Sequence, residues 1–137
     1  MPAIETTDWM ALKGRVETLA PSPVMQVIEP GAIVQLPAEP HILLSDVNND
    51  PVRLGIDRRL HVRSGTLMLT VQWPIARDIT HVQLREIAGQ IAAHFPADTC
   101  MSYGASRLRV TTDAAALPAY VDGAYRVAVV RVPWSSI

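Results

Sequence analysis

The clearest pattern of apolar and polar positions lies in residues 65 to 74, GTLMLTVQWP. Apolar residues occupy every second position, which predicts a strand with one buried and one outward face. The buried face would carry Leu67, Leu69, Val71 and Trp73, and the outward face Thr66, Met68, Thr70 and Gln72. The outward set carries no charge, so it suits solvent and a contact with another protein chain equally well.

A second alternation precedes this strand, in residues 52 to 63. Its apolar set is Val52, Leu54, Ile56, Leu60 and Val62, and its polar set is Arg53, Asp57, Arg59, His61 and Arg63. Ser64 and Gly65 separate the two alternating segments, so we predict that they turn the chain into a long antiparallel hairpin. Arg58 interrupts the apolar set, which favours a bulge near residues 57 to 59.

Two segments have the spacing of amphipathic helices. Apolar residues from Trp9 to Leu19 predict an N-terminal helix, with Thr6, Thr7 or Asp8 as its cap. A second helix over residues 80 to 95 has a stronger start signal, because Thr80 and Gln83 fit a capping box. Its apolar stripe comprises Leu84, Ile87, Ala88, Ile91, Ala92 and Phe95.

Residues 21 to 40 hold five of the eleven prolines. This predicts an extended arm in which only residues 24 to 28 and 32 to 36 could pair as edge strands. Further strands are predicted over residues 41 to 47, 100 to 103, 107 to 112 and 124 to 132. The order of elements predicts one α+β domain over residues 1 to 137, with a mainly antiparallel sheet flanked by an N-terminal helix and one long central helix.

The composition restricts where the protein works. The chain has 137 residues, the size of one domain, and no apolar run long enough to span a bilayer. The N-terminus lacks the features of a signal peptide, so we expect a soluble protein made in the cytoplasm. A single cysteine, Cys100, excludes an internal disulfide and a cysteine-based zinc site.

No residue pattern points to catalysis or to a bound cofactor. The four histidines, His41, His61, His81 and His94, never stand at the three- or four-residue spacing that brings two of them onto one metal ion. SYGAS at residues 102 to 106 departs from the nucleophile motif, and isolated glycines form no phosphate-binding loop. We therefore expect no enzyme activity, no cofactor and no metal site.

Charge is unevenly distributed, although the net value is only −1. Residues 1 to 50 contain seven acidic and two basic residues, whereas residues 51 to 137 contain six acidic residues and ten arginines. The arginines that could share one outer sheet face are Arg53, Arg58, Arg59, Arg63, Arg107 and Arg109. Such a face is solvated, meets an acidic neighbouring protein, or lies loosely on a nucleic-acid backbone, and the sequence leaves all three open.

Four segments follow one another in a recognisable order: the strand GTLMLTVQWP, the helix VQLREIAGQIAAHFP, the strand SRLRVTT and the closing GAYRVAVVRVPWS. In this order, over roughly residues 40 to 137, they resemble the small tail terminator proteins of long-tailed bacteriophages and their relatives among gene transfer agents. The matching positions are Gly65, Leu67, Val71, Pro74, Ile87, Ala88, Ile91, Ala92 and Phe95. The connection WPIARD departs from that family because it is shorter and lacks glycine.

This resemblance implies a structural virion protein that caps the tail tube as a hexameric ring, stops tube growth and forms the tail side of the head–tail junction. It implies no reaction, no cofactor and no membrane contact. The implied partners are further copies of the chain, the tail tube protein, a head-closure or neck protein, and DNA that passes through the channel without sequence-specific binding. The alternatives are a neck or head-completion protein and a small ligand-binding module with a pocket between helix 80 to 95 and the sheet.

In a ring, the candidates for contacts between subunits or with partners are Arg53, Arg59, His61, Arg63, Thr66, Met68, Thr70, Gln72, Arg107 and Arg109. The outward strand residues would be buried between subunits or would line the channel. The acidic N-terminal half of one subunit would meet the arginine face of the next, and the proline-rich arm would wrap the neighbour. Reversing the charge of Arg59 or Arg63 should then weaken the ring and make its assembly sensitive to salt.

Overall fold

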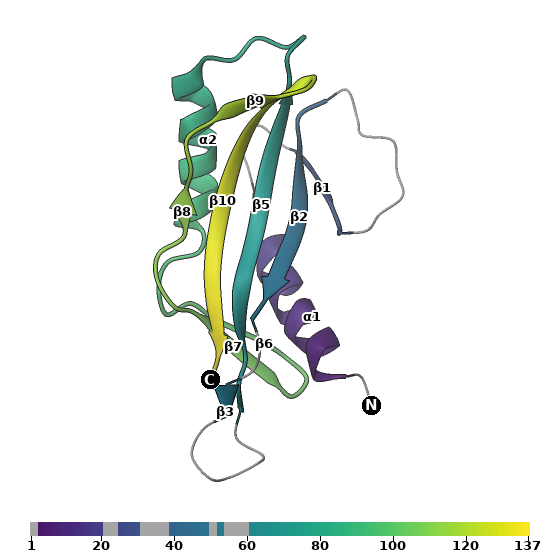
Figure 1. Cartoon of the computed structure of the whole chain (residues 1–137), viewed down its shortest axis with the longest axis vertical. Helices are drawn as coiled ribbons and strands as arrows, with labels where there is room; N and C mark the ends of the chain where they lie inside the picture. Colours follow the sequence, from purple (N-terminus) through teal and green to yellow (C-terminus); the bar gives the residue numbers. More distant parts are fainter. Residues whose placement is uncertain (1–2, 21–24, 31–38, 50–51, 54–60) are drawn as a thin grey trace.

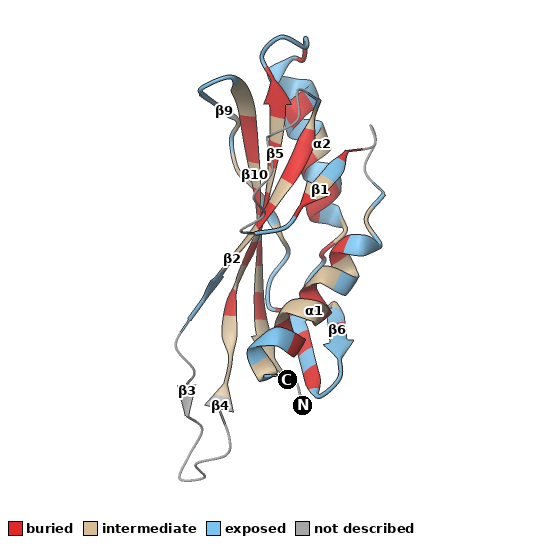
Figure 2. Ribbon diagram, turned by 90° about the vertical axis from the view of Figure 1, so that its right-hand side faces the viewer, coloured by how far each residue is buried: buried red, intermediate tan, exposed pale blue. Residues whose placement is uncertain are grey.

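In the part of the chain that the structure describes, two helices cover one face of a curved sheet and leave the other face uncovered (Figure 1). The structure is a computed structural model that describes residues 3–20, 25–30, 39–49, 52–53 and 61–137. The helices are α1 (Ile4–Glu17) and α2 (His81–Ala93). Figure 2 shows both of them on the same side of the sheet. The predicted α+β class with a mainly antiparallel sheet is confirmed.

The main sheet has the strand order β1-β2-β5-β10-β7-β6. These strands are β1 (Gln26–Ile28), β2 (His41–Asn48), β5 (Ser64–Pro74), β10 (Tyr125–Ser136), β7 (Ser106–Val110) and β6 (Cys100–Tyr103). Two short strands, β8 (Ala115–Ala116) and β9 (Tyr120–Asp122), join β7 in pairing along one side of β10. A separate ladder joins β3 (Val52–Arg53) to β4 (His61–Val62). Among these described strands, only β1 and β2 pair in parallel.

The two long central strands, β5 and β10, carry most of the core. Leu67, Leu69 and Val71 are fully buried at 0% exposure, and the residues between them on β5 are half-buried. The two faces predicted from the alternation are therefore confirmed. On β10 the inward set is Ala128, Val130, Val132 and Trp134, and the helices cover it with residues such as Leu12, Leu84 and Phe95.

The prediction of a hairpin that turns at Ser64 and Gly65 is wrong. β5 runs straight through both residues, and its antiparallel partners are β2 and β10 instead of the segment that immediately precedes it. Gly65 permits a close approach between strands, because an added Cβ would lie 2.5 Å from the Val47 carbonyl oxygen and 2.9 Å from the Trp134 ring. The bulge predicted at residues 57 to 59 lies outside the described residues.

Helix α1 confirms the predicted N-terminal helix but begins earlier than its cap residues suggested. Ala3 occupies the N-cap position without a side-chain hydrogen bond. Thr7 and Asp8, which we predicted as caps, lie inside the helix and are each only 5% exposed. Thr7 Oγ1 donates to the Ile4 carbonyl oxygen within α1 and contacts Ser106, and Asp8 accepts from Arg63 and Ser106. The cap prediction failed because neither side chain accepts a hydrogen bond from a backbone amide of the first turn.

Helix α2 confirms the predicted second helix and its capping box. The Thr80 hydroxyl accepts from the Gln83 amide at 3.1 Å, and the Gln83 side chain accepts from the Thr80 amide at 3.0 Å. The expectation of one long central helix holds only roughly, because α2 has 13 residues and α1 has 14. Figure 1 shows α2 beside the upper part of the sheet and α1 beside the lower part.

The described part of the proline-rich segment forms an edge strand. In β1, Gln26 stands opposite His41 of β2, so the first predicted edge run does pair with the sheet. Met25 and Ile28 are buried at 6% exposure each, which anchors this edge to the core. The second predicted run, residues 32 to 36, lies outside the described residues, and the extent of the domain over the whole chain stays a prediction.

Candidate interaction surface

The uncovered side of the sheet is a continuous surface formed by β2, β5 and β10. Directly opposite residues of antiparallel strands share one face, so the strand register defines its members. We call this surface the open face. Its residues are Leu43, Ser45 and Val47 of β2, Thr66, Met68 and Thr70 of β5, and Val129, Arg131 and Pro133 of β10.

The open face is apolar in its middle. The side chains of Leu43, Met68 and Val129 are half-buried, although both described helices lie on the other side of the sheet. Met68 stands directly opposite Arg131, which is exposed. A surface of half-buried aliphatic side chains with an arginine beside them has the mixture of groups found at protein interfaces.

A buried histidine lies at one end of the open side of the sheet. His41 is fully buried, with Nε2 at 2.7 Å from the Gln72 side-chain oxygen and Nδ1 at 2.9 Å from the Glu39 carbonyl oxygen. Its ring packs edge-on against Tyr125, with the ring centroids 5.4 Å apart. Gln72, one of the four predicted outward residues of β5, is therefore held in place by a side-chain hydrogen bond to His41.

Three arginines lie on the same side of the molecule as the open face. Arg107 and Arg109 are exposed on β7, as predicted, and the pairing of Arg109 with Ser135 places it on the open side of β10. Arg131 is the third. None of the three forms an ion pair with a described residue.

Arg63 faces the opposite way, toward α1. Its Nε donates to Asp8 Oδ2 at 2.7 Å and its Nη2 donates to Asp8 Oδ1 at 3.1 Å. Ser106 Oγ also donates to Asp8 Oδ1, at 2.6 Å, and Thr7 Oγ1 lies 2.6 Å from Ser106 Oγ. The hydrogen bond to the carboxylate raises the pKa of the Arg63 guanidinium, and burial opposes this only in part.

The outward orientation predicted for Arg63 is therefore wrong. Its side chain follows the alternation of β5, in which odd-numbered residues point toward the helices, and not the alternation of the segment before it. Arg53 and His61 are backbone partners in the β3–β4 ladder, and Arg59 lies outside the described residues. A contact of these residues with another subunit stays a prediction.

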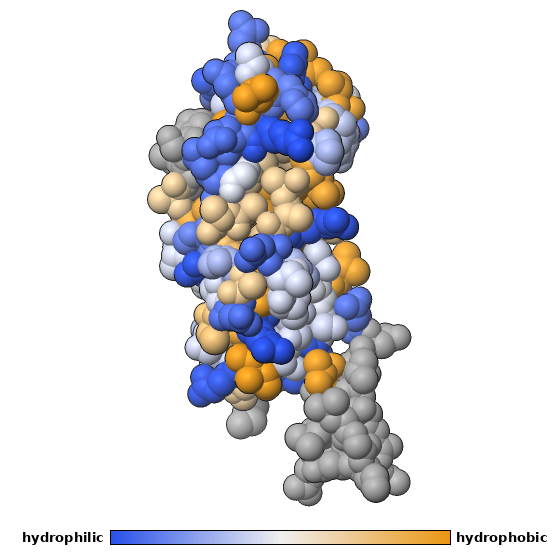
Figure 3. Space-filling view, turned by 90° about the vertical axis from the view of Figure 1, so that its left-hand side faces the viewer, coloured by the Kyte–Doolittle hydropathy of each residue, from blue (hydrophilic) through white to orange (hydrophobic). Residues whose placement is uncertain are grey.

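A depression of about 530 Å³ lies beside α2, on the helix-covered side of the sheet. We call it the α2 groove. It is lined by Trp73, Asp78, Ile79, Val82, Gln83, Glu86, Ile87 and Gln90. Val82 is 74% exposed there, and neither acid forms an ion pair with a described residue. On this side of the molecule a weakly hydrophobic zone lies between hydrophilic residues above and below it (Figure 3).

His94 joins the ends of the two helices. Arg15 Nη2 donates to the His94 carbonyl oxygen at 2.6 Å, and the His94 ring lies 2.7 Å from Thr18 Oγ1. Burial lowers the pKa of His94, and the nearby Arg15 charge lowers it further. The uncharged ring is therefore the form that this junction favours.

Among the described residues, no group of three or more His, Cys, Asp and Glu side chains is placed to hold a metal ion. Cys100 is an exposed free thiol. No described helix is long and apolar enough to cross a membrane.

Sequence reasoning missed Arg131 and the acids of the α2 groove. Arg131 could have been found, because it alternates with Val130 and Val132 in the last strand. Asp78 and Glu86 carry no such signal, since one lies in a loop and the other on a solvated helix face. Only the fold brings them to the rim of one apolar depression.

Comparison with known proteins found a matching family model and a similar solved structure. A family model described as phage tail terminator protein matches residues 9–134. A solved structure with 15% sequence identity superposes with a TM-score of 0.72, covering 98% of this chain and 93% of that chain. At this identity the likeness supports the fold alone. No protein with a curated description matches the chain.

Proposed function

Because the chain belongs to the phage tail terminator family, we propose that it caps the end of the tail tube as a hexameric ring, stops tube polymerisation and forms the tail side of the head–tail junction. Membership of the family gives the chain a structural role in the phage tail and associates it with other tail components. The hexameric ring, the capping of the tube and the place at the head–tail junction go beyond what family membership gives, and they are our proposal.

The observation that carries the proposal is the open face. Leu43 and Val129 stand on either side of Thr70, and Met68 is the next outward residue of β5. We call Leu43, Met68 and Val129 the apolar band, and the described helices all lie on the other side of the sheet. In a monomer these side chains stay in partial contact with water, whereas a neighbouring subunit would bury them. A long twisted sheet with one uncovered face therefore favours assembly over an isolated subunit.

The partners of such a ring follow from its position. One side would contact the last ring of tail tube protein, and the other side would contact a head-closure or neck protein. DNA would pass through the channel without sequence-specific contacts. The place of action would be the head–tail junction of the virion, after synthesis in the host bacterial cytoplasm.

The test is to measure the mass of the full chain by light scattering, alone and with the tail tube protein of its own gene cluster. Tubes are then imaged by electron microscopy, and their lengths are measured. We expect a ring, alone or only in the presence of tubes, together with tubes whose growth stops. A chain that stays monomeric and leaves the tubes unchanged would contradict the proposal and favour a neck protein or a ligand-binding module.

A pair of variants ties this test to the open face. Met68→Lys introduces a charge at the centre of the open face, where a monomer leaves the side chain half-exposed. It should abolish capping while the chain remains folded by circular dichroism. Ala105→Lys, in the exposed turn between β6 and β7, is the matched control and should leave capping unchanged.

A further inference from the structure

We infer that the open face of one subunit docks on the α2 groove of the next copy, with Arg131 meeting Glu86 and Asp78 at the rim of the groove. This inference rests on the proposed function, because it names the two surfaces through which the ring would form. The occupant of the α2 groove is thus a second copy of this chain.

The charges of the open face all have one sign. On the open side of β2, β5, β7 and β10 the described charged residues are Arg107, Arg109 and Arg131. Asp113 lines a small depression that Arg131 also lines, but its Oδ1 accepts from the Ala97 amide at 2.8 Å and it forms no ion pair with Arg131. The Arg131 guanidinium therefore has no carboxylate partner among the described residues.

The α2 groove has the complementary composition. Its charged lining residues are both acids, Asp78 and Glu86, and its floor includes Trp73, Ile79 and Ile87. Glu86 has only a long 3.5 Å hydrogen bond from Gln90. An apolar floor with an acidic rim matches a surface that presents an aliphatic band with an arginine beside it.

The match extends to the arrangement of the side chains. Met68 and Arg131 stand opposite each other in the β5–β10 ladder, so one aliphatic side chain and one guanidinium project side by side. The α2 groove pairs exposed Val82 with Glu86 one helical turn later on the same helix. A contact between Met68 and Val82 across the interface would thus have the Arg131–Glu86 ion pair next to it.

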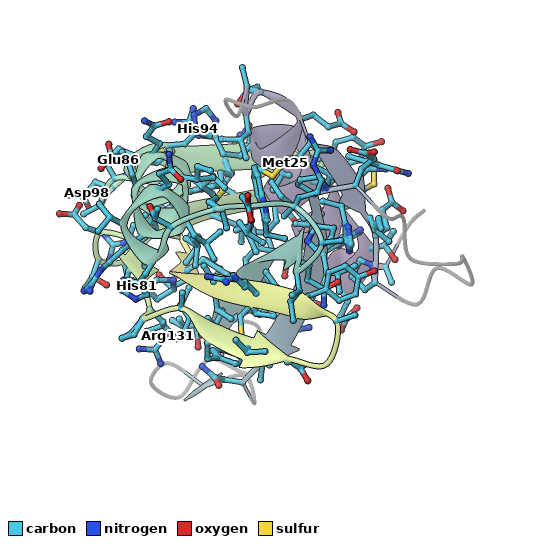
Figure 4. All side chains as sticks on the ribbon, turned by 90° about the horizontal axis from the view of Figure 1, so that it is seen from above. Met25, His81, Glu86, His94, Asp98 and Arg131 are labelled. Carbon is cyan, nitrogen blue, oxygen red and sulfur yellow. The ribbon has the colours of Figure 1, made fainter. Side chains whose placement is uncertain are left out.

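The two surfaces lie on opposite sides of the sheet, as Figure 4 shows for Arg131 and Glu86. The open face and the α2 groove of one chain therefore cannot contact each other. Contact between unlike surfaces of identical chains joins them head to tail, which generates closed rings or open filaments instead of two-fold dimers. Closure into a ring on the end of a tube is the outcome that the proposed function requires.

The experiment is a charge exchange in the full chain, read as assembly with the tail tube protein by light scattering and electron microscopy. Arg131→Glu and Glu86→Arg should each raise the protein concentration needed for half-assembly roughly tenfold or more. The chain that carries both changes should assemble within about threefold of wild type, because the ion pair is restored with reversed polarity. An equimolar mixture of the two single variants should also assemble, since each junction then has one acid and one arginine.

Arg85→Glu is the matched control, because Arg85 is exposed on α2 but does not line the groove. It should assemble like wild type, and circular dichroism should show every variant folded. Single variants that assemble normally, or a charge exchange that fails although the chain is folded, would overturn the inference and leave the proposed ring standing. A wild-type chain that forms no ring would overturn both. Normal assembly combined with loss of DNA binding in Arg131→Glu would assign the arginine to DNA instead.

Discussion

Replacing Asp8 with alanine should lower the free energy of unfolding by about 3 kcal/mol. The Asp8 carboxylate accepts two hydrogen bonds from Arg63 and one from Ser106. Ser106 is fully buried, so its hydroxyl loses an acceptor that water cannot replace, at a cost of about 1–2 kcal/mol. The Arg63 side chain is 25% exposed and can regain some hydration, so its loss is limited to about 1–2 kcal/mol.

The assay is reversible urea denaturation followed by circular dichroism, together with a thermal melt. For a chain of this size, 3 kcal/mol corresponds to a fall in Tm of roughly 10 °C. Glu17→Ala is the matched control, because it removes another acid from α1 that is 66% exposed and lies 3.9 Å from Lys13. Its effect on the free energy of unfolding should stay below about 0.5 kcal/mol.

A double-mutant cycle with Arg63→Ala separates the ion pair from the hydrogen bond to Ser106. The coupling energy between Asp8 and Arg63 should be about 1–2 kcal/mol. If Asp8→Ala were no more destabilising than Glu17→Ala, the reasoning from buried hydrogen bonds would be refuted. A coupling energy near zero would refute the ion pair alone and leave the loss at Ser106 as the cause.

The remaining predictions concern a close approach, a helix cap and a protonation. Gly65→Ala should destabilise the chain by about 1–3 kcal/mol in urea denaturation, because the added Cβ would collide with the backbone of β2. Gly14→Ala should instead stabilise α1 by about 0.5–1 kcal/mol, because nothing lies within 4 Å of the added Cβ. Equal effects of the two changes would contradict this. Thr80→Ala should cost about 1 kcal/mol by removing the cap of α2, and an unchanged urea midpoint would speak against it. The pKa of His94 in the folded chain is lowered from its ordinary 6.5, so the unfolded chain binds the proton more readily. The contribution of His94 to the free energy of unfolding is therefore present above pH 6.5 and is lost as the pH falls below that value. Tm should therefore fall less on acidification in His94→Gln than in wild type, and parallel pH profiles would refute the assignment.

The Asp8–Arg63 ion pair makes Arg63 unsuitable for testing contacts between subunits by charge reversal. A charge reversal at Arg63 would place an acid against Asp8 inside the chain. The variant would lose stability first, so a loss of assembly would report on folding and not on a contact between subunits. Arg131 is the better probe, because it is exposed and free of ion pairs with the described residues.

Patterns that depend on neighbouring residues alone were predictable from the sequence. The alternation of residues 65 to 74 fixed which side chains of β5 are buried, and the capping box at Thr80 fixed where α2 begins. These predictions succeeded because strand alternation and helix capping are set within a few residues along the chain. The order of the elements likewise sufficed for the α+β class.

Strand pairing and polar contacts over long separations were decided by the tertiary structure. Gly65 is compatible with a turn and with a close approach, and only the packing of Val47 and Trp134 selects the second. Asp8 looks like a helix cap until Arg63, 55 residues later, is brought to its carboxylate. The sequence by itself therefore determined the faces of the strands and helices, whereas the fold decided which faces meet, because burial free energy depends on neighbours that are distant along the chain.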